Sequence, residues 1–174
     1  STNSKSDEQD VSLTDYIERM KADQEVIYYI TADSLMAAKN SPHLEIFKKK
    51  DIEVILLGDR VDEWMIASLP EFSGKKLQSI AKGDLDLGKL EDKKEKDKKK
   101  KIEDDAKNLV EKIKESLGDK VAEVKVTHRL TDSPACLVVG ENDISGNLER
   151  ILKAAGQNTP DVKPILEINP EHDL

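Results

Sequence analysis

The sequence predicts an α/β protein of two units: a small three-layer α/β/α subdomain, followed by a truncated α+β unit. Two apolar runs, EVIYYIT and EVILLG, are typical of buried strands, and a helical pattern lies between them. This order predicts a right-handed βαβ unit with parallel strands. Glycines and a charge run then mark a boundary before residue 102. We expect a disordered tail at 1–10, the first unit at 11–90, a charged linker at 91–101 and the second unit at 102–174.

Caps and periodicity predict the other elements of the first unit. Ser12 and Asp15 form a capping pattern before a short amphipathic helix. Ser41 and Pro42 restart the helical pattern within the crossover between the two strands. The segment DRVDEWMIASL, residues 59–69, predicts a further helix, and KLQSIAK predicts a third, weaker strand.

The second unit begins with a predicted helix that Gly118 ends. One face of this helix is apolar: Ile102, Ala106, Leu109, Val110, Ile113 and Leu117. The runs VAEVKVTHRL and ACLVVG predict two strands paired with each other through the TDSP connection. ENDISGNLERILKAAG predicts an amphipathic helix, and ILEIN predicts another strand.

Composition limits the classes of partner and compartment. The net charge is -8, which opposes binding to nucleic acid or to anionic lipid. A single cysteine, Cys136, excludes an intramolecular disulfide and favours the reducing cytoplasm. The sequence has neither an apolar run long enough to cross a membrane nor the pattern of a secretion signal at its start. We expect a soluble cytoplasmic protein without nucleic-acid or membrane partners.

The lysine-rich run is the most conspicuous local feature. Residues 91–105 hold seven lysines, and seven acidic residues match them, so that this segment is neutral. A nucleic-acid site would need unneutralised positive charge. The run therefore predicts a solvated linker or a solvated helix face.

Candidate catalytic groups give a rival interpretation. His128 and Cys136 lie close together in the sequence and could serve a small α/β enzyme as base and nucleophile. However, Cys136 begins the apolar run ACLVVG, which favours a buried thiol that does not ionise. His43 and His172 are too scattered to predict a metal site, and no glycine pattern that cradles phosphate occurs.

Two helices carry candidate binding surfaces. On a helical wheel of residues 59–69, Val61, Met65 and Leu69 share one arc, so we expect Trp64 on its flank to be partly exposed. In the second unit an apolar stripe serves either as core or as an exposed binding surface. Its residues are Ile144, Leu148, Ile151, Leu152 and Ala155.

Several segments together resemble a known family. DYIERMKADQEVIYYITADS, SPHLEIFKKKDIEVILLGDRVDEWMIASLPEFSGK, VTHRLTDSPA and AAGQNTPDVKPILEINPEH are similar to the bacterial HtpG type of the ninety-kilodalton heat-shock chaperone family. The resemblance runs in order from about residue 10 to the end. The lysine-rich stretch at 91–101 departs from the bacterial pattern.

The resemblance implies a fragment: the C-terminal part of the middle domain, followed by the beginning of the C-terminal domain. The family's ATP site, with its Mg, would precede residue 1, and the helices that form the homodimer would follow Leu174. We therefore expect no catalytic, cofactor or metal residue in this chain, and we expect the chain alone to be a monomer.

The resemblance also assigns a function. It implies a client-binding and force-transmitting segment of an ATP-dependent chaperone that assists protein folding under stress. The expected contacts to unfolded or partly folded clients are Glu63, Trp64, Ile144, Leu148, Ile151 and Leu152. A stand-alone protein-interaction module is a further alternative. We expect Glu63 to keep the face around Trp64 soluble.

Overall fold

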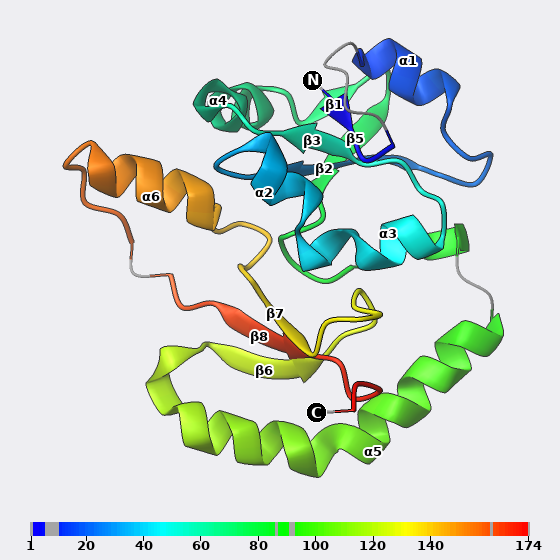
Figure 1. The fold of residues 1–174 in the computed structure, drawn as a ribbon, viewed down its shortest axis with the longest axis vertical. Helices are drawn as coiled ribbons and strands as arrows, with labels where there is room; N and C mark the ends of the chain where they lie inside the picture. Colours follow the sequence, from blue (N-terminus) through cyan, green and yellow to red (C-terminus); the bar gives the residue numbers. More distant parts are fainter. Residues whose placement is uncertain (1, 6–10, 86, 91–92, 161, 174) are drawn as a thin grey trace.

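Two units with separate sheets form the molecule (Figure 1). The computed structural model describes residues 2–5, 11–85, 87–90, 93–160 and 162–173. The elements around the first sheet are followed by a 3-10 turn that ends at Leu90, and a long helix begins at Lys93. The mixed helices and sheets confirm the predicted α/β class.

The first unit is built on a five-stranded sheet in the order β1-β3-β2-β5-β4. Strand β2 pairs in parallel with β3 and with β5, whereas β1 and β4 pair antiparallel at the edges. This arrangement confirms the predicted βαβ unit. The bounds are β1 Thr2–Asn3, β2 Val26–Thr31, β3 Ile55–Leu57, β4 Glu71–Phe72 and β5 Lys75–Ser79.

Helices cover both faces of this sheet. Successive side chains of β2 point to opposite sides, so each face supplies apolar side chains to a separate cluster. Tyr28 and Ile30 belong to a buried cluster with Phe47 of α3, while Ile27 and Tyr29 belong to a second cluster on the other face. The three predicted layers are therefore present. The helices are α1 Leu13–Glu18, α2 Leu35–Lys39, the 3-10 turn η1 Pro42–Leu44, α3 Glu45–Lys49 and α4 Arg60–Ser68.

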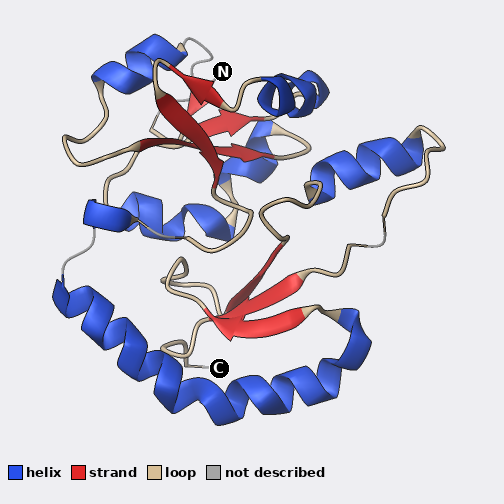
Figure 2. Ribbon diagram, turned by 180° about the vertical axis from the view of Figure 1, so that it is seen from behind, coloured by secondary structure: helices blue, strands red, loops and turns tan. Residues whose placement is uncertain are grey.

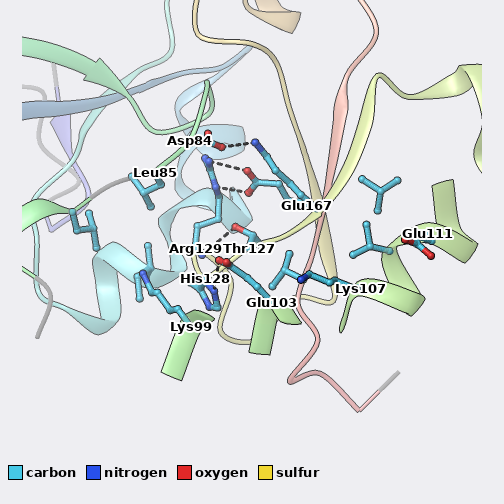
Figure 3. Close-up of a pocket in the computed structure, with 16 residues that line it drawn as sticks. Asp84, Leu85, Lys99, Glu103, Lys107, Glu111, Thr127, His128, Arg129 and Glu167 are labelled. Atoms are coloured by element: carbon cyan, nitrogen blue, oxygen red, sulfur yellow. Dashed lines mark hydrogen bonds and ion pairs between the residues drawn. The ribbon is translucent and has the colours of Figure 1, made fainter. Parts of the chain in front are cut away.

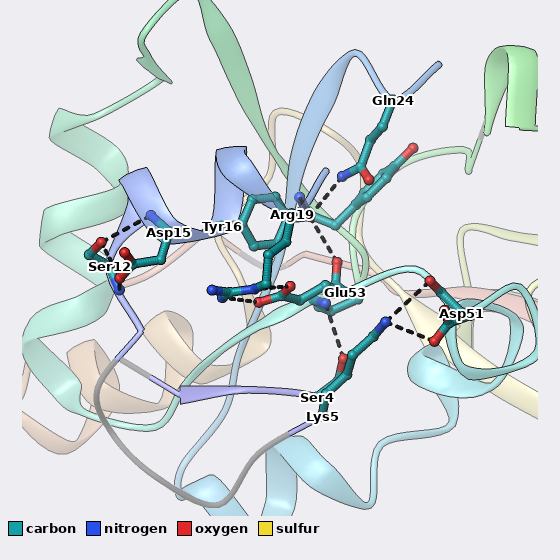
Figure 4. A network of polar contacts seen from close by, with 11 residues as sticks. Ser4, Lys5, Ser12, Asp15, Tyr16, Arg19, Gln24, Asp51 and Glu53 are labelled. Carbon is teal, nitrogen blue, oxygen red and sulfur yellow. Dashed lines mark hydrogen bonds and ion pairs between the residues drawn. The ribbon is translucent and has the colours of Figure 1, made fainter. Parts of the chain in front are cut away.

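Polar contacts attach α1 to the sheet (Figure 4). The Tyr16 hydroxyl donates to the carbonyl oxygen of Glu53 at 2.8 Å and accepts from Gln24 at 2.8 Å. Arg19 forms a bidentate ion pair with the Glu53 carboxylate, with N–O distances of 3.0 and 2.8 Å. The Ser12 and Asp15 capping pattern is confirmed at the start of the helix.

The prediction of a disordered tail is wrong for residues 2–5. Thr2 and Asn3 form β1 against β3, and the backbone N–H of Ser4 donates to the Val54 carbonyl at 2.9 Å. A polar segment can join a sheet edge because strand pairing uses the backbone rather than the side chains. Residues 6–10 of the predicted tail lie outside the described residues.

The second unit has a three-stranded sheet with an order that the sequence did not predict. Strands β6 and β7 do not pair with each other: both pair with β8, which lies between them. The central position of β8 gives it two partners, parallel β6 and antiparallel β7. The elements are α5 Lys93–Leu117, η3 Gly118–Lys120, β6 Glu123–Val126, β7 Ala135–Val138, α6 Gly146–Ala154 and β8 Ile165–Ile168.

The predicted linker is also corrected. Residues 93–101 form the first turns of α5, a helix of 25 residues, after the short 3-10 turn η2 Gly88–Leu90. Lysine and glutamate have good helix propensity. Residues 97, 98, 100 and 101 are exposed, so this part of the segment takes the alternative of a solvated helix face. Val110, Ile113 and Leu117 pack on the second sheet, but Leu109 of the predicted apolar face is 48% exposed. Residues 91 and 92 lie outside the described residues.

Candidate functional site

The six candidate residues lie on or beside two helices, α4 and α6, both at the right of Figure 2. Hydrogen bonds of Glu63 join the two helices. Glu63 and Trp64 belong to α4, which begins where the backbone N–H of Asp59 donates to the Asp62 carboxylate at 3.0 Å. Leu148, Ile151 and Leu152 belong to α6, and Ile144 directly precedes its cap. Ser145 caps α6 by accepting from the Leu148 N–H at 2.9 Å.

Helix α4 presents large apolar side chains to solvent. Trp64 is 50% exposed, which confirms the expectation of partial exposure. The arc that holds Val61 and Met65 also faces solvent: Val61 is 66% and Met65 is 42% exposed, while Ile66 packs against the sheet. A helical wheel defines the arcs of a helix but does not decide which arc faces the core. The result is an apolar surface of Val61, Trp64 and Met65, hereafter the α4 surface.

Glu63 differs most from its predicted role. Its side chain is only 7% exposed, so it does not act as an exposed charge that keeps the surface soluble. The carboxylate accepts hydrogen bonds from the Ser145 hydroxyl and from the Asn147 amide, both at 2.9 Å. Both donors belong to the start of α6. Glu63 therefore joins the two helices.

Further polar contacts hold α6 against the first unit. Arg150 forms an ion pair with Asp33, and the Lys82 ammonium donates to the Asp143 carbonyl at 2.6 Å. Burial lowers the pKa of Lys82, although the nearby carboxylates of Glu63 and Asp143 act in the opposite direction. We name the contacts of Glu63, Lys82 and Asp33 with residues 143–150 the α6 junction.

The apolar stripe of α6 is neither fully buried, as a core would be, nor fully exposed, as a free binding surface would be. Ile144, Leu148, Ile151 and Leu152 are all half-buried, and Ala155 is exposed. Ile151 lines a surface depression together with Ala32 and Arg60 of the first unit. The stripe is thus partly covered by the first unit and partly accessible.

A second contact between the units centres on Arg129 (Figure 3). This side chain is 1% exposed, and its guanidinium donates to the backbone carbonyls of Ile80 and Gly83 at 2.5 and 2.7 Å. Its Nε lies 2.6 Å from the carboxylate of Glu167, which is 2% exposed. The guanidinium thus joins the end of β5 and its following loop to the centre of the second sheet.

Glu45 extends this contact along the TDSP connection. Its carboxylate accepts from the backbone N–H groups of Thr131, Asp132 and Ser133 at 2.6, 2.8 and 3.2 Å, and from the Ser133 hydroxyl. Burial tends to raise the pKa of Glu45, but these hydrogen bonds outweigh burial and leave the pKa below its usual value. We name the contacts of Arg129 and Glu45 the Arg129 junction.

His43 lies in the same region. It is buried, and burial together with the nearby positive charge of Arg129 lowers its pKa to about 4. A hydrogen bond with the Leu137 backbone and the charge of Glu45 act in the opposite direction. The ring is therefore neutral at physiological pH.

A cavity of about 500 Å³ lies beside the Arg129 junction, between α5, β6 and the first unit. Its lining combines aliphatic residues such as Leu85 and Val124 with charges of both signs, and Lys125 is paired with Asp84 (Figure 3). Within the described ranges, no group of three or more His, Cys, Asp or Glu side chains is arranged to hold a metal ion. In the described part of the chain, no helix is long and apolar enough to span a membrane.

His128 and Cys136, the residues of the rival enzyme interpretation, lie next to different carboxylates. The Nε2 of His128 lies 3.3 Å from Glu103, whereas the Cys136 thiol lies 3.9 Å from Glu167. Cys136 is buried, and burial raises the pKa of its thiol to about 12. A thiol with such a pKa is a poor nucleophile at neutral pH, so the geometry does not favour this interpretation.

Sequence reasoning missed the groups that join the units, namely Ser145, Asn147 and Arg150 on one side and Asp33, Glu45 and Lys82 on the other. Of these residues, only Ser145 could have been found from the sequence, because a serine directly before an amphipathic run is a common helix cap. The remaining contacts join residues more than 60 positions apart and leave no local pattern.

Comparison with known proteins decides the family. The family model described as Hsp90 protein matches residues 1–174, the whole chain. The chain belongs to the Hsp90 family. This confirms the resemblance described in the sequence analysis.

Similar Hsp90 proteins come from several bacteria, and each is named chaperone protein HtpG. The chain is 64% identical over 174 residues to the protein of Nitrosococcus oceani and 67% identical over 174 residues to that of Nitrosospira multiformis. It is 66% identical over 172 residues to the protein of Dechloromonas aromatica. These matches cover 99–100% of this chain but 27% of each relative. The chain thus spans about a quarter of the length of these Hsp90 relatives.

Proposed function

We propose that this chain is the client-binding and force-transmitting segment of an ATP-dependent molecular chaperone. The observation that carries the proposal is the α4 surface, where Trp64, Val61 and Met65 are exposed. Glu63 of the same helix contacts the start of α6, which carries a half-buried apolar stripe. Unfolded proteins expose apolar side chains that a folded protein would bury. An exposed apolar surface on a heavily charged protein is suited to bind them reversibly.

Trp64 is the proposed anchor for clients. Tryptophan combines a large apolar area with few rotatable bonds and is enriched among residues that dominate binding energy. The flexible Met65 side chain suits partners of varied shape, since methionine adapts to irregular surfaces. Leu148 and Leu152 would extend the contact onto the second unit. The role of Glu63 is indirect in this proposal, since α6 already occupies its carboxylate.

Force transmission rests on the Arg129 junction. A change of position of the second unit must pass to the first through groups that resist separation. The buried ion pair and the backbone contacts of Arg129 and Glu45 supply such groups. We propose that they move the two units together when ATP is hydrolysed elsewhere in the parent protein.

The position within the parent follows the resemblance. We propose that the first unit belongs to the middle domain and the second to the beginning of the C-terminal domain. ATP and Mg would bind outside this chain, the parent would be a cytoplasmic homodimer, and this chain alone would be a monomer without nucleic-acid or membrane partners.

Substitution of Trp64 tests the function. In the protein extended to the length of its relatives, Trp64→Ala should weaken binding of a reduced, alkylated and therefore unfolded model protein by about thirtyfold, or about 2 kcal/mol. Its cost in unfolding free energy should be about 1 kcal/mol or less, because the side chain is half exposed. Leu148→Ala and Leu152→Ala should show the same pattern with smaller losses of affinity.

Leu109→Ala is a matched control, since Leu109 is comparably exposed but lies on α5. It should leave affinity for the unfolded protein unchanged. Large losses of stability with unchanged affinity for Trp64→Ala would return this residue to a structural role and overturn the proposed function.

A further inference from the structure

Helix α6 is held in place almost without an apolar core. None of its residues, Gly146–Ala154, belongs to any of the four buried apolar clusters of the described chain. An amphipathic helix usually docks through its apolar face, and polar contacts add a smaller share. The apolar stripe of α6 is only half-buried, so the position of the helix depends to a larger extent on a few specific polar groups.

Glu63 is the most deeply buried of these groups. Removing a carboxylate from water is costly unless hydrogen bonds replace its hydration. The two 2.9 Å bonds from Ser145 and Asn147 supply this replacement, and both are lost together when α6 moves away. Hydrogen bonds to charged groups are among the stronger ones in proteins.

The carboxylate also acts on α6 itself. The Ser145 hydroxyl donates to Glu63 while its oxygen accepts from the Leu148 N–H, so one side chain caps the helix and fixes it to α4. The negative charge then lies at the N-terminal end of α6, where the helix dipole favours it. Docking and capping of α6 are thus coupled through one contact.

We propose that Glu63 is a positioning residue whose carboxylate fastens the N-terminal end of α6 to α4, and that loss of this contact releases α6 as a separately moving arm. The proposal deepens the function proposed above and rests on it where clients are concerned, since α6 carries three of the proposed client contacts. Fastened, α6 holds its stripe half-buried beside the α4 surface. Released, it exposes Leu148 and Leu152 and separates them from Trp64.

Hydrogen exchange of the α6 amides in the 174-residue chain tests the fastening without any client. In Glu63→Ala the α6 amides, including those of Glu149 and Ala155, should exchange about tenfold faster or more, because at least one charged hydrogen bond is lost. Glu63→Gln can still bond both partners and should show a smaller increase. Asn147→Ala leaves α4 intact, removes one of the two bonds and should also lie in between.

Glu71→Ala is the control, because Glu71 is an exposed carboxylate of the same unit. It should leave α6 exchange unchanged, and exchange of the β2 amides should be unchanged in every variant. The fluorescence of Trp64, the only tryptophan, should shift in Glu63→Ala because the adjacent position 63 has lost its contact with α6. Unchanged α6 exchange in both Glu63→Ala and Asn147→Ala would overturn the proposal, as would α6 amides that are already unprotected in the parent chain.

The fastening and the function can fail separately. If Trp64→Ala loses affinity for the unfolded protein while Glu63→Ala leaves α6 exchange unchanged, the function stands and the fastening is overturned. If α6 is released in Glu63→Ala but Trp64→Ala binds normally, the fastening stands and the client surface is overturned.

Discussion

The Arg129 junction and the α6 junction both join the two units, but they do so in different surroundings. In the first, Arg129 and Glu167 are almost completely buried, and the guanidinium donates to the backbone carbonyls of Ile80 and Gly83. In the second, only Glu63 is buried, and the ion pair of Arg150 with Asp33 is largely exposed. An interaction that water cannot replace is costly to break, whereas one at the surface is easily exchanged for hydration.

This difference assigns the two junctions different tasks. The Arg129 junction joins the second sheet to the first unit through buried groups, as the proposed transmission of force would require. The α6 junction allows one helix to leave and return while that fixed contact persists. The proposed function, in which clients are bound and released, needs both properties in one segment.

Among the variants of the two junctions, removal of Arg129 should have the largest effect on the free energy of unfolding. Arg129→Ala leaves the buried Glu167 carboxylate without its cation, so the free energy of unfolding should fall by about 3–5 kcal/mol. Urea denaturation measures the change. The double variant Arg129→Met with Glu167→Leu removes both charges and should recover a large part of the loss. A loss below about 1 kcal/mol in Arg129→Ala would mean that this junction is no firmer than a surface contact.

The pH dependence of stability should reveal the burial of His43. Its pKa falls from 6.5 in the unfolded chain to about 4 in the folded protein, so the unfolded state binds a proton first as the pH falls. Above pH 6.5 His43 does not lower the free energy of unfolding. As the pH falls from 6.5 toward 4, the free energy of unfolding decreases because of His43, by roughly 3 kcal/mol in total. Urea denaturation across this range should show the slope, and His43→Asn should flatten it. An equal slope in the variant would contradict the buried, neutral imidazole.

Removal of Arg150 should have the smallest effect. Arg150→Ala breaks an exposed ion pair and should cost about 1 kcal/mol or less in the free energy of unfolding. The measurement is the same urea denaturation, repeated at 1 M salt, where the difference from the parent should shrink. A loss as large as that of Arg129→Ala would remove the distinction between the two junctions.

Much of the fold could be predicted because its signals are local. The runs EVIYYIT and EVILLG are apolar on both faces, as strands covered by helices on two sides must be. The β4–β5 turn was missed because β4 has only two residues, although Ser73 and Gly74 adopt the positive φ of a tight turn. The pairing of β6 and β7 was predicted wrongly because their true partner, β8, follows about 30 residues later.

The candidate site was predictable only in part, for the same reason. Partial exposure of Trp64 follows from its position between acidic residues and an apolar arc, which are neighbours in sequence. The burial of Glu63 depends on Ser145, 82 positions away, and an isolated carboxylate is ordinarily expected at the surface. Long-range polar partners cannot be inferred from periodicity, which reports only on apolar faces.

Hydrogen exchange of both junctions in one sample of the unaltered chain tests the central distinction most directly. The amide of Ile46, which donates to the Arg129 carbonyl, and that of Gly83, which donates to the Val139 carbonyl, should exchange only through global unfolding and should depend strongly on urea. The α6 amides of Glu149 and Ala155 should exchange about 100-fold faster or more, with little dependence on urea, because a local opening suffices. Equal rates with the same urea dependence at both junctions would contradict a fixed contact and a releasable one.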